Sequence, residues 1–180
     1  MKKILPALLT ALFIANLFWS CEKDDICAEG TPTTPSLIVE FYDKDNRTVL
    51  KPVTNFRYSV GGAEADTLPG APDPSPLERI EVPLRTDATS TQWYFRLSTP
   101  VTNGVNLNTD IITFNYTTNE IYVSRACGYK TNFTLNPDTN ENPNPVFEDV
   151  PEADGLWIQD VSLEQPNIEN ENEVHVKIYY

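Results

Sequence analysis

Apolar and polar residues alternate with a period of two along several short stretches of the chain. In 36–42, Leu37, Val39 and Phe41 fall on one face, and Ile38 alone breaks the alternation. This pattern is typical of a β-strand with one buried face. The same pattern, or a shorter version of it, predicts further strands over 56–60, 80–84, 92–98, 111–116, 120–126, 131–135, 157–163 and 173–180.

Turn-forming residues separate these stretches. Residues 43–46 and 117–119 favour chain reversals, and Pro83 indicates an edge strand or the end of a strand. No window of about 12 residues after Cys21 has helical periodicity. About eight or nine short strands with turn-rich links predict an all-β fold, an antiparallel β-sandwich (immunoglobulin-like or similar), as a single domain over 36–180. An up-and-down β-barrel is the alternative.

The first 20 residues differ from the rest of the chain. Lys2 and Lys3 precede an apolar stretch, and small Ser20 comes directly before Cys21. A basic start, an apolar run and a small residue at the processing site are features of a secretory signal peptide. As a helix, the run would span about 24 Å, short of a hydrocarbon core of about 30 Å, so an uncleaved anchor is the alternative. We predict a signal peptide over 1–20, a lipidated, palmitate-bearing Cys21 and a tether over 21–35.

The number of cysteines supports a modified Cys21. The chain has three cysteines, and an odd number in an exported chain leaves one unpaired unless it is modified. With Cys21 acylated, Cys27 and Cys127 remain to form one disulfide in an oxidising compartment. Two buried free thiols are the alternative.

Acidic residues outnumber basic ones. The chain has 26 Asp and Glu against 13 Lys and Arg, a net charge of −13, and loss of Lys2 and Lys3 with the leader makes it −15. A surface of this charge repels phosphate backbones and anionic headgroups. The sequence therefore argues against nucleic acid as a partner and against an electrostatic attachment to a membrane, and predicts attachment through a lipid.

The residues after Cys21 carry a resemblance. Lys23, Asp24 and Asp25 resemble the surface-export signal of Bacteroidota-type lipoproteins. That resemblance implies an outer-membrane lipoprotein exposed at the cell surface, and attachment on the periplasmic side is the alternative.

A wider resemblance covers the chain from the leader to its last residues. The stretches CEKDDIC (21–27), TPTTPSLIVEFYD (31–43), SRACGYKTNF (124–133) and EVHVKIYY (173–180) resemble an uncharacterised Bacteroidota lipoprotein family, a domain of unknown function. The family implies an address without an activity. It also implies an outer-membrane β-barrel protein as a candidate partner.

Residues that could carry catalysis are few. His175, the only histidine, is predicted to face solvent from a strand, and no motif brings a nucleophile to it. Asp43, Asp45 and Asn46 begin like a calcium loop but lack its glycine and final glutamate, so a hairpin turn explains them better. We predict no catalytic residue, no metal site, no cofactor and no enzymatic activity. A small hydrolase built on carboxylates is the remote alternative.

Tyrosines and one arginine are the candidates for binding. Tyr42, Tyr94 and Tyr122 fall on the polar faces of their strands, where neighbouring strands would join them into an exposed patch for sugars or a protein. Cross-strand pairs with wet hydroxyls are the alternative. Alternation puts Arg125 on an apolar face, so either an ion pair satisfies it or a bulge near Cys127 turns it outward; a ligand contact is the other interpretation.

Two loops between predicted strands have features of their own. Asp66-Thr67-Leu68 resembles the O-glycan acceptor of this bacterial group, which makes Thr67 a candidate glycosylation site. Residues 136–154 are predicted to form a long, acidic, proline-rich loop that Phe147 and Val150 fasten to the core.

The sequence favours a non-enzymatic protein-binding or envelope-assembly component. This interpretation rests on the predicted anchor, on the tether and on the lack of a catalytic motif. A surface glycan-binding module that uses the tyrosine patch is the alternative.

Overall fold

The computed structural model describes residues 26–60, 76–149 and 155–180. The leader, Cys21, Lys23, Asp24, Asp25, Thr67 and Val150 lie outside these residues. The chain divides into two compact units. We call residues 33–121 and 130–180 the sandwich unit, and residues 1–32 with 122–129 the disulfide unit. Within the described residues, no helix is long and apolar enough to cross a membrane.

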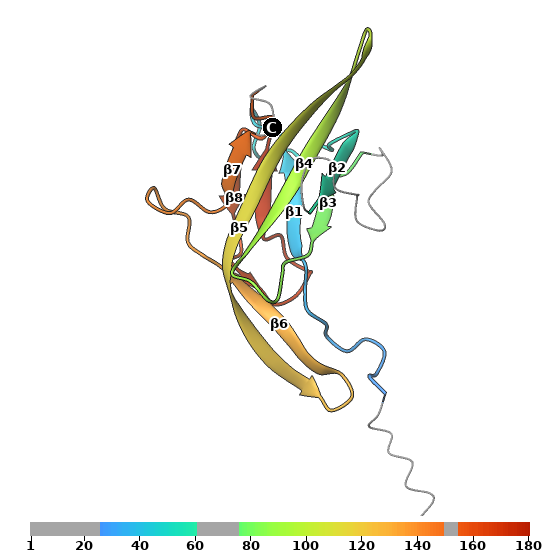
Figure 1. The fold of residues 1–180 in the computed structure, drawn as a ribbon, viewed down its shortest axis with the longest axis vertical. Coiled ribbons are helices and arrows are strands. Elements are labelled where there is room, and N and C mark those ends of the chain that lie inside the picture. The colour runs from blue at the N-terminus through green and yellow to red at the C-terminus, as the bar shows by residue number, and fades with distance from the viewer. Residues whose placement is uncertain (1–25, 61–75, 150–154) are drawn as a thin grey trace, which may run out of the picture. The chain divides into compact units, whose positions relative to one another are not determined.

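The described residues form two sheets (Figure 1). The first sheet has the strand order β3-β1-β10-β8, and the second has the order β2-β4-β5-β6-β9, with β7 pairing with β5. The strands are β1 (Leu37–Tyr42), β2 (Phe56–Ser59), β3 (Arg79–Val82), β4 (Ser90–Val101), β5 (Gly104–Ser124), β6 (Gly128–Leu135), β7 (Val146–Asp149), β8 (Asp160–Leu163), β9 (Asn167–Ile168) and β10 (Val176–Tyr179).

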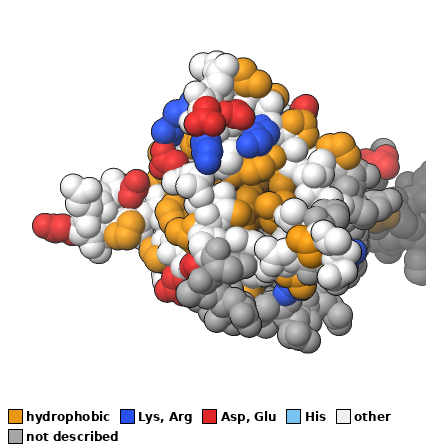
Figure 2. Space-filling view, turned by 90° about the horizontal axis from the view of Figure 1, so that it is seen from above, with side chains coloured by type: hydrophobic (Ala, Val, Ile, Leu, Met, Phe, Trp, Pro, Cys, Tyr) orange, Lys and Arg blue, Asp and Glu red, His pale blue; other side chains and the backbone are white. Residues whose placement is uncertain are grey.

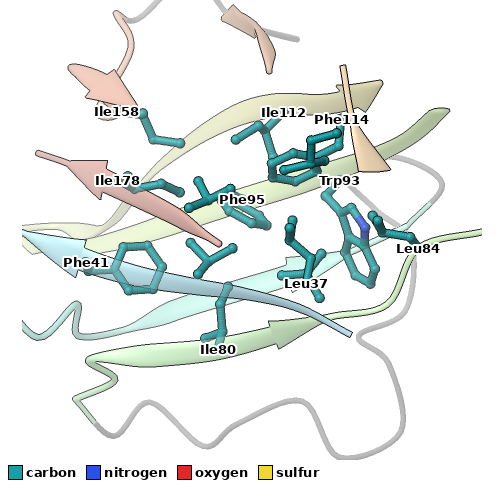
Figure 3. Packing of buried hydrophobic residues seen from close by; sticks show 14 of the residues in the cluster. Leu37, Phe41, Ile80, Leu84, Trp93, Phe95, Ile112, Phe114, Ile158 and Ile178 are labelled. Carbon is teal, nitrogen blue, oxygen red and sulfur yellow. The ribbon is translucent and has the colours of Figure 1, made fainter. Parts of the chain in front are cut away.

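The predicted β-sandwich is confirmed. Inward-facing residues of both sheets meet in one apolar core, in which Phe41 of β1 and Phe95 of β4 are fully buried (Figure 3). The alternation predicted for β1 and β4 thus marks the faces that pack together. β3 ends at Val82, directly before Pro83, and β3 lies at a sheet edge. Neither of these positions requires Pro83 to donate a ladder hydrogen bond.

One strand pair departs from the predicted antiparallel arrangement. β1 pairs with β10 in parallel, with Val39 opposite Val176 and Phe41 opposite Ile178. Short turns force consecutive strands to be antiparallel, but no short turn joins these two, so they can pair in parallel. β1 consequently lies between β3 and β10 inside its sheet, and Ile38 is buried although it breaks the alternation.

β5 is longer than the sequence indicates. The strands predicted over 111–116 and 120–126 are parts of one strand of 21 residues that ends at Ser124. The turn predicted at 117–119 is therefore wrong. Thr117 and Thr118 are β-branched and therefore also fit a strand. The pairing of β5 with β6 favours the strand over the turn at these residues.

The connection over 136–149 is tied to the sandwich. β7 arises within it and pairs with β5, with Phe147 opposite Ile112, so the fastening role predicted for Phe147 is confirmed. The buried Asn144 side chain bonds to backbone groups of Asn115 and Asn136 that a neighbouring strand would otherwise satisfy. Its Oδ1 accepts from the Asn115 N–H (2.9 Å), while its Nδ2 donates to the carbonyls of Asn115 (2.9 Å) and Asn136 (2.7 Å).

Candidate functional site

Tyr42 is occupied by contacts within the first sheet. It lies opposite Tyr179 with the ring centroids 5.9 Å apart, and the Lys177 ammonium lies 5.2 Å from the centre of its ring. Its hydroxyl donates to Glu40 Oε2 (2.9 Å), and desolvation together with this carboxylate raises the pKa of Tyr42 to about 12. Tyr42 therefore forms the cross-strand pair that was the alternative to an exposed patch.

Tyr42 and Tyr94 do not form the predicted patch, because their strands are not neighbours. Tyr42 belongs to β1 of the first sheet, whereas Tyr94 belongs to β4 of the second sheet, where its hydroxyl donates to Gln92 Oε1 (3.4 Å). The two strands are not neighbours. Tyr122 belongs to the disulfide unit. Membership of a sheet is a non-local property, and alternation within one strand does not reveal it.

His175 is buried, contrary to the predicted exposure. The Ile38 backbone N–H donates to Nδ1 of the His175 ring (2.9 Å). The backbone N–H of His175 donates in turn to the Ile38 carbonyl (3.1 Å). Because Nδ1 accepts, the imidazole that fits this site is neutral, and desolvation lowers its pKa below the ordinary value. His175 links the residue before β10 to β1, which is a structural role.

The turn after β1 explains its acidic residues. Asp43 Oδ1 accepts from the backbone N–H groups of Asp45 (2.7 Å) and Asn46 (2.9 Å), and these bonds lower the pKa of Asp43. That geometry is an Asx-type turn, and it lies where a hairpin turn was predicted. No cluster of three or more His, Cys, Asp or Glu suited to a metal occurs in the described part of the chain.

A two-stranded ribbon extends from the second sheet. β4 and β5 pair continuously from Ser90 opposite Asn115 to Val101 opposite Gly104. β2 accompanies β4 only as far as Leu97, and β7 accompanies β5 only from Asp110 onward. We call residues 98–107 the arm; Figure 1 shows this hairpin continuing beyond the ends of the neighbouring strands.

Segment 155–158 holds the base of the arm. Asn108 Nδ2 donates to the Gly155 carbonyl (2.6 Å), and the Ile158 N–H donates to Oδ2 of the buried Asp110 (2.8 Å). The Trp157 indole N–H donates to the Phe95 carbonyl (3.1 Å). The point at which the arm leaves the sandwich is thus fixed by bonds to both of its strands.

The arm combines exposed apolar side chains with a complete lack of charge. Val101 is 52% exposed and Leu107 is 51% exposed. No residue from Leu97 to Thr109 is charged, although 22% of the chain is. Figure 2 looks down on this end of the sandwich and shows hydrophobic side chains in the middle of the face, with charged side chains mainly around them. Exposed ribbons of this kind normally carry charges that prevent pairing with other chains.

The disulfide unit contains the predicted bridge. Cys27 and Cys127 are bonded, with the sulfur atoms 1.99 Å and the Cα atoms 4.8 Å apart. The Cys127 N–H donates to Ser124 Oγ (3.0 Å), which closes the turn after β5. Gly128 follows with a φ of 71°, a left-handed conformation that favours glycine. The predicted pairing of Cys27 with Cys127 is therefore confirmed.

Exposed rings lie beside this bridge. Tyr122 is 54% and Tyr129 is 67% exposed, and their rings meet edge to face with centroids 5.4 Å apart. Ile26 is 82% exposed and, with Tyr122 and Arg125, lines a hollow of about 570 Å³. Arg125 lies in the turn after β5 and is exposed, so it is not buried in an ion pair; the outward orientation is confirmed.

Residues 58–180 match the model of a protein family of unknown function, DUF6452. This match covers more than half of the chain. The chain belongs to this family. Comparison with curated proteins and with solved structures gave no match. The DUF6452 match includes the arm and Tyr122 to Tyr129, while β1 and Cys27 precede the matched residues.

Sequence reasoning missed the arm. A signal for it was present, because 97–109 is the uncharged continuation of two predicted strands in a strongly acidic chain. Tyr129 was also missed, since it follows a turn whose position depends on the bridge. The exposure of both features depends on where neighbouring strands stop, and no local pattern shows that.

Proposed function

We propose that this DUF6452 member is an exported, non-enzymatic, protein-binding lipoprotein of the outer membrane, anchored through Cys21 and exposed at the cell surface. The proposal makes the arm its binding surface. An outer-membrane protein, a β-barrel protein among the candidates, is the partner that the anchor would bring within reach. The Lys23-Asp24-Asp25 segment supports surface exposure, and the leader and cysteine number support the anchor.

The observation that carries the proposal is the uncharged arm with its exposed apolar side chains. Exposed apolar side chains on a ribbon with unpaired edges mark sites where another chain packs or adds a strand. Val101 and Leu107 are the two strongly exposed apolar side chains of the described arm. Natural proteins place Lys or other charges on such edges unless a partner covers them, and the arm has none.

Lack of charge makes the expected complex insensitive to salt. Screening weakens contacts between exposed charges, whereas burial of apolar surface is little affected. We therefore expect the affinity for the partner to change by less than roughly threefold between low and moderately high ionic strength. A steep loss of affinity with salt would instead indicate a charged surface outside the arm.

Photocrosslinking in intact cells tests the proposal. A benzoylphenylalanine is placed at Val101 or at Leu107, and the matched control is the same residue at exposed Thr118. We expect the same partner protein to be crosslinked from both arm positions and not from the control. A third probe at exposed Asn103 should crosslink this partner in the unchanged chain and lose it in a V101K/L107K chain. Repeated recovery of the protein alone would overturn the proposal.

The anchor is tested separately. The mass of the N-terminal peptide of the mature protein shows whether Cys21 carries acyl chains, and Cys21→Ser should move the protein out of the membrane fraction. An unmodified Cys21 in protein that remains on the membrane would contradict the lipid anchor.

A further inference from the structure

We propose that the exposed rings of the disulfide unit lie against the lipid surface to which Cys21 anchors the chain, so that Tyr122 and Tyr129 contact the headgroup region of the membrane. This inference rests on the lipid anchor of the proposed function. It goes beyond that function by assigning a second contact to the bilayer itself, made by residues of the folded chain.

The length of the tether gives the first argument. Only five residues, 22–26, separate Cys21 from Cys27. Fully extended, the six Cα–Cα steps from Cys21 to Cys27 span at most about 20 Å. The bridge places the Cys127 Cα 4.8 Å from that of Cys27. A turn that is 100 residues further along the chain is thereby confined close to the acylated residue.

The chemistry of the exposed residues gives the second argument. Tyrosine has an apolar ring and a polar hydroxyl, which is why it is enriched where apolar and aqueous regions of a membrane meet. Tyr122 and Tyr129 are exposed and in ring contact with each other, and Ile26 is exposed beside the bridge. Arg125 can reach lipid phosphate from the intervening turn while its stem stays on apolar surface.

The distribution of charge gives the third argument. The described residues of the disulfide unit contain one acidic residue, Glu29, and one basic residue, Arg125. The sandwich unit has 22 Asp and Glu against 9 Lys and Arg, a net charge of −13, and is repelled by anionic headgroups. The described part of the disulfide unit is therefore a neutral surface that can approach lipid, and it is the one next to the anchored segment.

The tether does not supply an electrostatic attraction to the membrane. Glu22, Asp24 and Asp25 outnumber Lys23 beside the anchor, so the tether does not attract an anionic surface. The main contact then comes from the rings and Ile26, and Arg125 adds a contact with the phosphate that both kinds of lipid carry. We therefore expect it to be nearly the same on phosphatidylethanolamine vesicles with and without phosphatidylglycerol, which a binding mode based on Arg125 alone would not predict.

Lipid photocrosslinking of the full lipidated chain tests the inference. Benzoylphenylalanine replaces Tyr129 in protein reconstituted into phosphatidylethanolamine vesicles, and mass spectrometry identifies the adduct. We expect lipid adducts at residue 129, and about tenfold fewer after Cys27→Ser with Cys127→Ser, because the open chain loses its high effective concentration at the surface.

A second measurement does not depend on opening the bridge. In vesicles, amide exchange over 122–129 should be roughly fivefold faster in a Y122S/Y129S chain than in the unchanged chain, while exchange in β1 stays equal. The result that overturns the inference is an acylated Cys21, read from the N-terminal peptide, without lipid adducts at 129. A protein adduct at 129 in intact cells also overturns it. An unmodified Cys21 overturns both this inference and the proposed function, which separates the two failures.

Discussion

β5 begins in the arm and ends in the disulfide unit, and its two ends are held in different ways. The arm depends on the ladder between β4 and β5 and on the bonds of segment 155–158 at its base. The disulfide unit is held by a covalent bond to a segment far earlier in the sequence. Within the described residues, the arm pairs only along its own ladder beyond Leu97 and Asp110, whereas the turn after β5 is bonded covalently to the segment that contains Cys27.

Loss of the bridge should have the largest effect. The bridge closes a loop of 100 residues, and such a loop contributes up to about 4.7 kcal/mol by restricting the unfolded chain. We expect Cys27→Ser with Cys127→Ser to lower the free energy of unfolding in urea by about 3–4 kcal/mol. Partner binding by the arm should persist under conditions where the chain stays folded. Loss of both together would show that the two ends of β5 are coupled.

Asn144 tests the part of β5 that lies between its two ends. Asn144→Ala leaves the Asn115 N–H and carbonyl without their side-chain partner, at a cost of about 2–3 kcal/mol in the free energy of unfolding. The matched control is exposed Asn142→Ala, whose bonds all come from its backbone and which should change stability by less than about 0.5 kcal/mol. Equal effects of the two changes would contradict the assigned role.

Acid should weaken the sandwich unit through His175. Its native pKa is lowered by desolvation, so above about 6.5 its contribution to stability is complete. As the pH falls below about 6.5, the unfolded chain binds the proton first, and the free energy of unfolding decreases. Urea midpoints measured across this range should fall less in His175→Asn, whose amide oxygen can still accept from Ile38. A parallel fall in both proteins would assign the acid sensitivity to carboxylates.

Changes in the arm should affect stability least. Val101→Ser with Leu107→Ser alters two exposed side chains, so the free energy of unfolding should change by less than about 0.5 kcal/mol. Capture of the partner should nevertheless be lost. A large loss of stability would show that the arm is part of the core instead of a surface for another chain.

Local patterns predicted what depends on neighbours in the sequence. Alternation located β1 and β4 and their buried faces, and cysteine number located the bridge because thiol chemistry leaves few choices. The parallel pairing of β1 with β10, the burial of His175 against Ile38 and the separation of Tyr42 from Tyr94 all depend on which distant strands become neighbours. No pattern within a strand contains that information.

The parallel pair of β1 and β10 also determines how late the first sheet can form as the chain emerges. Ile38 and His175, which hydrogen-bond at the start of this pair, are 137 residues apart in the chain. The first sheet therefore cannot close until almost the last residues of the chain are available, and contacts of such long range form slowly. Until β10 is available, one edge of the apolar strand β1 is unpaired, and such an edge is prone to aggregation. For the export proposed above, this topology favours delivery of the chain in an unfolded and protected form.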